Sequence, residues 1–158
     1  MTKPLAGDDQ ADAPSRAGSR EWVNVLGVRV SAVNLESATR RIVAAVREHR
    51  CEYVCVRDAH GVIRCQKDAE LRSAHNRAFL VTPDGMPLVW ALKRAGHSGS
   101  GRVYGPDLML AVIEAGLSGG VRHYLYGATP ETIERLQARL LAKFPGIEVV
   151  GSDAPPFR

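Results

Sequence analysis

Four short segments of the chain hold the residues best suited to chemistry. They are residues 57–60, 82–85, 102–107 and 127–129, and each places polar side chains near the expected end of a strand or start of a helix. In open parallel sheets, ligands bind beyond the carboxyl ends of the strands. The four segments are therefore the candidate site.

Asp84 is the candidate catalytic residue. It follows an expected strand and a proline, and Gly85 and an expected helix follow it. A carboxylate there can act as a general base towards a hydroxyl, which contributes roughly 10²- to 10⁴-fold to a rate. Pro-Asp-Gly is also a favoured turn, so a turn or helix-capping role stays open. Thr82 and Gly85 flank Asp84 as candidate substrate contacts.

The segment from Arg102 to Asp107 suggests a place for an anionic ligand. Arg102 can pair with a phosphate, and Asp107 can hold sugar hydroxyls. Tyr104 and Gly105 lie between them and complete this candidate binding segment. A solvated arginine, and an aspartate that complements a helix dipole, are the structural alternatives.

Gly127, Ala128 and Thr129 form a strand-to-helix turn whose free N–H groups can attract a phosphate. The turn lacks the G-x-G-x-x-G pattern of dinucleotide-binding proteins, and many such turns are purely structural. His60 is a candidate proton carrier or phosphate contact, with a local hydrogen-bonding role as the alternative.

Strands alternate with helices along the chain, which predicts an α/β fold with a mostly parallel, Rossmann-like sheet covered by helices. A hairpin around Gly27 comes first. Residues 1–20 are expected to be a flexible tail, and residues 21–158 one domain. The expected strands cover residues 22–26, 28–33, 53–56, 79–81, 123–126 and 148–151. Helices are expected over residues 36–50, 86–95, 107–117 and 130–144, and a further helical region is expected from about residue 60, broken or renewed at residue 68.

The amino-acid composition limits the classes of function that the chain can have. The chain has 158 residues, of which 45% are hydrophobic, and a net charge of +4, which suits an anionic ligand. Aromatic residues make up only 6%, too few for the stacking surfaces of nucleic-acid binders. The cysteines and histidines show no metal-binding pattern, so no metal is predicted. The sequence shows neither a secretory signal nor a membrane helix, which predicts a cytoplasmic protein with at most peripheral membrane association.

The order of several short motifs is more specific than any one of them. These motifs are Asp68-Ala-Glu-Leu-Arg72, Asn76-Arg-Ala78, Thr82-Pro-Asp-Gly-Met86, Val89-Trp-Ala91, Arg102-Val-Tyr-Gly-Pro-Asp-Leu108, Tyr124-Leu-Tyr-Gly127, Phe144-Pro-Gly146, Gly151 and Pro155-Pro-Phe157. From about Trp22 to the last residue, the sequence resembles the WecG/TagA/CpsF family of bacterial glycosyltransferases.

The resemblance implies transfer of a sugar, often N-acetylmannosamine, from a UDP-sugar to an undecaprenyl-diphosphate-linked acceptor. It implies inversion at the anomeric centre, no metal and no other cofactor. Asp84 corresponds to the proposed base of the family. Without a metal, protein N–H groups and arginines must stabilise the departing UDP, a role that fits Arg102 and residues 127–129. Other copies of the same chain, in a homo-oligomer, are the remaining expected partners.

Two departures from the family pattern favour an alternative function. Family members usually carry Thr and Asn, or a related Thr-Gly pair, on the strand end before the histidine, where this chain has Cys55-Val-Arg57-Asp58-Ala-His60. Arg57 is a candidate substrate contact or an ion-pair partner of Asp58. Members also continue beyond the point that corresponds to Arg158, which predicts a C-terminally truncated chain. The alternative is an inactive remnant that acts only as a binding or subunit-pairing module.

Overall fold

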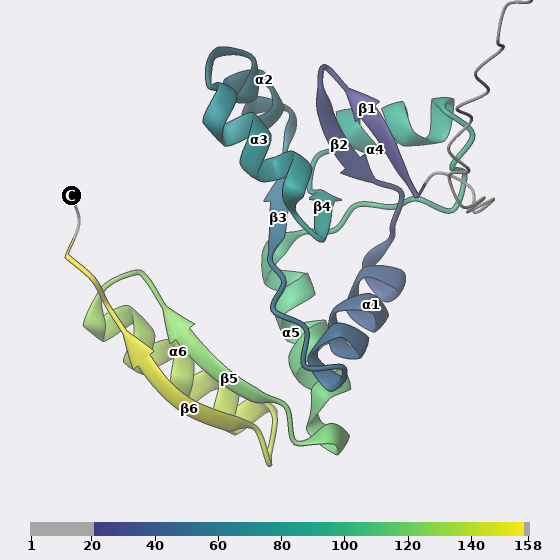
Figure 1. Cartoon of the computed structure of the whole chain (residues 1–158). Coiled ribbons are helices and arrows are strands. Elements are labelled where there is room, and N and C mark those ends of the chain that lie inside the picture. The colour runs from purple at the N-terminus through teal and green to yellow at the C-terminus, as the bar shows by residue number, and fades with distance from the viewer. Residues whose placement is uncertain (1–20, 157–158) are drawn as a thin grey trace, which may run out of the picture.

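The computed structural model describes residues 21–156 (Figure 1), so the expected tail and Phe157 lie outside the described residues. The α/β class and the N-terminal hairpin are confirmed. The strands are β1 (Trp22–Val25), β2 (Val28–Ser31), β3 (Val54–Arg57), β4 (Leu80–Pro83), β5 (Arg122–Tyr126) and β6 (Glu148–Asp153). The helices are α1 (Leu35–Arg47), α2 (Ala59–Lys67), α3 (Ala69–Arg77), α4 (Met86–Arg94), α5 (Gly105–Gly116), the 3₁₀ turn η1 (Leu117–Gly119) and α6 (Pro130–Lys143).

The described strands pair in three two-stranded sheets. β1 and β2 are antiparallel, whereas β3–β4 and β5–β6 are parallel pairs. The parallel strands were expected in one sheet but occupy two. The N–H of Val81 in β4 bonds to the Ser31 hydroxyl of β2 at 3.0 Å, so a side chain joins these strands instead of a backbone ladder.

Local capping explains where most helices begin. Asn34, Asp58, Asp68 and Thr129 each accept a hydrogen bond from the N–H three residues later, which satisfies a free donor of the first turn. α4 and α5 instead have proline in the first turn, where its missing N–H costs nothing. No helix within residues 21–156 is long and apolar enough to cross a membrane.

The core lies on both faces of the β3–β4 pair. Val81 packs with the hairpin, α2 and α4, while its neighbour Leu80 packs on the opposite face with α1 and α5. This alternation buries every residue of β4 and fixes the strand end from which Asp84 emerges.

α5 joins this core to the β5–α6–β6 unit. Leu108 packs towards α1, whereas Ile113 packs towards α6 with Leu140, Phe144 and Ile147. A helix that is apolar on two sides is buried between two layers, and Figure 1 shows α5 between α1 and the β5–β6 pair.

Candidate active site

Asp84 lies immediately beyond β4, beside the end of β3. Its N–H donates to the Arg57 carbonyl at 2.8 Å, which continues the parallel pairing by one residue. The Asp84 side chain is 24% exposed. It does not cap α4, because the N-cap is Gly85 and no side chain bonds to the first turn. The carboxylate is therefore free of the capping role that the sequence left open.

The Arg102 side chain contacts the Asp84 carboxylate. Its Nη2 lies 3.2 Å from Asp84 Oδ1, and its Nε donates to the Asp84 backbone carbonyl at 2.6 Å. The guanidinium also lies over the Tyr104 ring, 4.8 Å from its centroid. A planar cation that is held by a carboxylate and a ring is suited to bind a planar or tetrahedral oxyanion once the carboxylate releases it.

Backbone hydrogen bonds hold the loop before α5 in place on both sides of Arg102. The Gly101 N–H donates to the Val33 carbonyl at 3.1 Å, and the Val103 N–H donates to the Pro83 carbonyl at 2.8 Å. These bonds fix the loop between the start of α1 and the end of β4, so that Arg102 lies next to Asp84.

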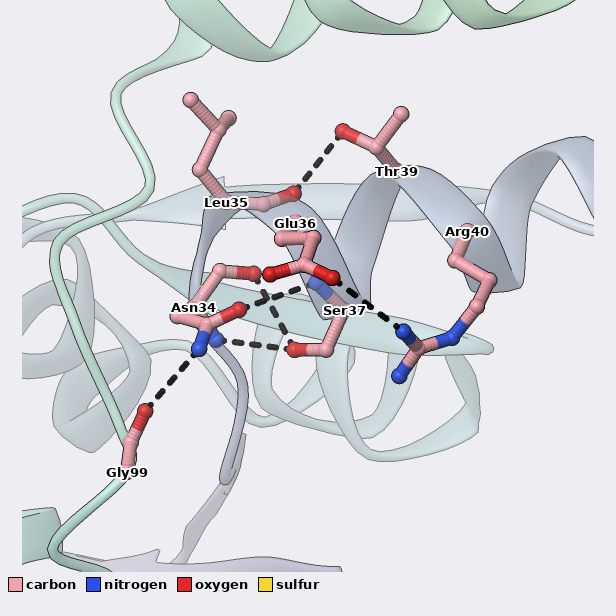
Figure 2. A network of polar contacts seen from close by, with 7 residues as sticks. All are labelled: Asn34, Leu35, Glu36, Ser37, Thr39, Arg40 and Gly99. Atoms are coloured by element: carbon pink, nitrogen blue, oxygen red, sulfur yellow. Dashed lines mark hydrogen bonds and ion pairs between the residues drawn. The ribbon is translucent and has the colours of Figure 1, made fainter.

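Asn34 serves two elements at once (Figure 2). Its Oδ1 accepts from the Ser37 N–H at 2.9 Å, which caps α1, while its Nδ2 donates to the Gly99 carbonyl at 3.2 Å. A Cβ on Gly101 would lie 3.4 Å from the Asn34 Cβ, so the loop approaches the helix start closely. The amide side chain therefore ties the helix cap to the loop that holds Arg102.

We expect Asn34→Asp to loosen this loop while preserving the helix. Aspartate caps helices as well as asparagine does, but it has no N–H for the Gly99 carbonyl. Loss of one hydrogen bond should speed amide exchange at Gly101 and Val103 by roughly fivefold. Hydrogen exchange read by mass spectrometry measures this.

Ser37→Ala is the matched control for that substitution. It removes the bond from the Asn34 N–H to the Ser37 hydroxyl, at 3.0 Å, without touching Gly99. It should lower the free energy of unfolding by about 1 kcal/mol or less and leave the loop's exchange unchanged relative to global unfolding. Equal loop exchange in Asn34→Asp and the unmodified chain would rule out the tether.

The other predicted residues near Asp84 take different positions. Thr82 is fully buried, and its hydroxyl has no hydrogen-bond partner among the described residues. Gly105 is the first residue of α5, where a Cβ would come within 3.7 Å of Val56. Asp107 lies exposed in the first turn of α5. Arg102 thus contacts both Asp84 and Tyr104, whereas Thr82 is buried within β4.

The Arg57 side chain contacts His75 and not the group of Asp84, Arg102 and Tyr104. Its Nε donates to His75 Nε2, and His75 Nδ1 in turn contacts the Leu71 carbonyl at 2.7 Å. A Cβ on Gly61 would lie 2.7 Å from Arg57 Cδ, so only glycine leaves room for this path. Within residues 21–156 Arg57 forms no ion pair with Asp58, which caps α2 instead.

His75 was not among the residues predicted for the site. It lies 18 residues from Arg57 and is 2% exposed. No local spacing signals such a contact. The side chain of His60, by contrast, lies exposed in the first turn of α2.

Gly127 and Ala128 of the turn line a separate cavity of about 340 Å³ between β5, α5 and α6. Gly127 and Ala128 have φ values of +113° and +59°, and Thr129 caps α6. His123 also lines this cavity, where burial lowers its pKa. Neither Asp84 nor Arg102 is among the lining residues, so this cavity is separate from the Asp84–Arg102 contact.

Metal-ligating side chains do not gather in the part of the chain that the structure describes. No group of three or more His, Cys, Asp or Glu residues there could hold an ion. Burial raises the pKa of the Cys55 and Cys65 thiols, so the reactive thiolate form is disfavoured.

A comparison with protein families agrees with the order of motifs in the sequence. Residues 23–158 match the family model described as the glycosyl transferase WecG/TagA/CpsF family. The match includes every residue of the Asp84–Arg102 site and extends over almost the whole chain. This chain therefore belongs to the WecG/TagA/CpsF family of glycosyltransferases.

Proposed function

We propose that this chain transfers a sugar from a UDP-sugar to a lipid-linked acceptor, with Asp84 as the general base. Family membership supports a glycosyl transfer in the synthesis of cell-surface polysaccharide. The observation that carries the residue assignment is the contact between Asp84 and Arg102 at the end of β4, at 3.2 Å. It pairs a proton acceptor with a cation that can hold a diphosphate.

The proposed reaction is a single displacement. Asp84 takes the proton of an acceptor hydroxyl, and the hydroxyl oxygen forms a bond to the anomeric carbon of the donor sugar. The bond from that carbon to the diphosphate oxygen breaks, and UDP departs with the electron pair. Attack from the face opposite UDP inverts the anomeric centre, and the proton then leaves Asp84 for solvent.

Arg102 has to change partner during this reaction. In the structure the guanidinium occupies Asp84 Oδ1, one of the two oxygens that could take the proton. A UDP diphosphate offers Arg102 a more highly charged partner, so donor binding releases Asp84. This exchange stabilises the leaving group without a metal and ties activation of the base to arrival of the donor.

The other residues of the group have supporting roles in the proposal. Tyr104 supports the guanidinium from one side, and exposed Asp107 is available for sugar hydroxyls. The backbone of Gly85 lies next to the carboxylate. The lipid-linked acceptor of the proposed reaction lies in a membrane. We therefore expect the chain to associate peripherally with the cytoplasmic face of that membrane.

Transfer by the purified chain tests the proposal directly. We expect a product when UDP-N-acetylmannosamine is mixed with a short-chain lipid diphosphate that carries N-acetylglucosamine. Anomeric proton couplings in the NMR spectrum of the product should show inversion, and excess chelator should leave the rate unchanged. A chelator-sensitive rate or a retained anomeric centre would contradict the proposed mechanism.

A subunit-pairing module is the second candidate, and the outer face of the β5–β6 pair favours it. Tyr124, Tyr126 and Val150 on these strands are 59%, 73% and 57% exposed, which is unusual for large apolar side chains that lie together. Sugar transfer by the chain alone would reject a purely non-enzymatic role.

A further inference from the structure

α4 has a sharply divided surface. Leu88 and Leu92 are buried against the hairpin core and Val89 is also buried, whereas Met86 and Trp90 are 45% and 63% exposed. Met86 and Trp90 are four residues apart, so they lie on the same side of the helix. The outward side of α4 therefore begins with two large apolar side chains that nothing in the described structure covers.

The same side of the helix ends in positive charge. Lys93 and Arg94 form its last turn, and α4 contains no acidic residue. Neither cation forms an ion pair with any residue of the described region. We call Met86, Trp90, Lys93 and Arg94 the α4 outer face.

This combination matches the chemistry of a lipid surface. Tryptophan is favoured at the boundary between lipid chains and headgroups, and lysine and arginine are attracted to anionic headgroups. The face has too few residues to insert deeply, which suits reversible docking.

The α4 outer face also lies next to the proposed active site. Met86 follows Asp84 by two residues, and Gly85 between them is the N-cap of α4. Figure 1 shows α4 beside the hairpin, at the end of the molecule away from β5 and β6. A membrane that met this face would lie close to the Asp84 carboxylate.

We propose that the α4 outer face docks on an anionic lipid bilayer and holds Asp84 at the level of the headgroups. This inference rests on the proposed function, because a lipid-linked acceptor presents its sugar at that level. Met86 and Trp90 enter the headgroup boundary, and Lys93 and Arg94 contact lipid phosphates. The acceptor hydroxyl then reaches the base without leaving the membrane surface.

Vesicle binding by the full chain tests the proposal. The chain has two tryptophans, so Trp22→Phe leaves Trp90 as the only indole. With vesicles of phosphatidylglycerol and phosphatidylcholine, we expect a blue shift of Trp90 emission and quenching by brominated lipid chains. Vesicles of phosphatidylcholine alone should bind far more weakly. Equal binding to both vesicles, or no blue shift, would overturn the proposal.

A matched pair of double variants separates this face from general charge attraction. Lys93→Gln with Arg94→Gln should weaken binding about 25-fold, since each cation near an anionic surface contributes roughly a factor of five. Arg64→Gln with Lys67→Gln removes the same charge from the last turn of α2 and should change binding little. Equal losses in the two double variants would refute docking through α4.

A separate measurement distinguishes failure of docking from failure of the proposed function. UDP binding without vesicles should be the same in both double variants and the unmodified chain. Absence of UDP binding in the unmodified chain would reject the proposed function. Unchanged vesicle binding after loss of Lys93 and Arg94, with UDP binding intact, would reject the docking alone.

Discussion

Asp84→Asn is expected to lower the rate of sugar transfer by roughly 10²- to 10⁴-fold, because an amide cannot accept the proton of the acceptor hydroxyl. The Asn side-chain oxygen can still accept a hydrogen bond from Arg102, whose Nη2 lies 3.2 Å from Asp84 Oδ1. The fold should therefore change little, and UDP should bind at least as tightly, because the diphosphate no longer competes with a carboxylate for Arg102. Initial rates at saturating donor and acceptor measure the effect, and a thermal melt checks the fold.

Asp58→Asn is the matched control for the loss of a carboxylate. Asp58 lies on the neighbouring loop, where its Oδ1 accepts from the Gly61 N–H at 2.8 Å. Asparagine caps a helix equally well, so this variant should keep both stability and transfer. Wild-type transfer by Asp84→Asn would show that Asp84 is not the base, even if the chain proves to be a transferase.

Arg102→Ala is expected to weaken UDP binding by about 10- to 150-fold, the range for losing a hydrogen bond between charged groups. Its effect on folding should be small, because the Arg102 side chain is 52% exposed and surface ion pairs add little stability. Calorimetric titration with UDP measures the affinity. Asp84→Asn should lower the maximal rate, whereas Arg102→Ala should mainly lower the donor affinity.

Arg102→Lys tests whether the shape of the guanidinium matters. Lysine keeps the positive charge but cannot make two parallel hydrogen bonds or stack flat on Tyr104. We expect an affinity between those of the unmodified chain and Arg102→Ala. Unchanged UDP affinity in Arg102→Ala would mean that the ion pair with Asp84 is purely structural and that another group holds the diphosphate.

The helix starts could be predicted from the sequence because their signals are local. Asn34 and Thr129 each bond to an N–H three residues away, and proline marks the first turns of α4 and α5. The position of Asp84 after a buried strand was equally visible, since a short, mostly apolar run ends at Pro83 and Gly85 follows Asp84. Family membership followed from the order of such segments.

The partners of the site residues depend on packing between elements that are distant in the sequence. Arg102 reaches Asp84 across 18 residues, Asn34 reaches Gly99 across 65, and Arg57 turns to His75 instead of Asp58. Local preference places a side chain on a strand end or helix face, but the way layers pack decides what it touches. For that reason, the sequence predicted the turn at residues 127–129. The cavity beside Gly127 and Ala128, by contrast, depends on how α5 packs against β5 and α6.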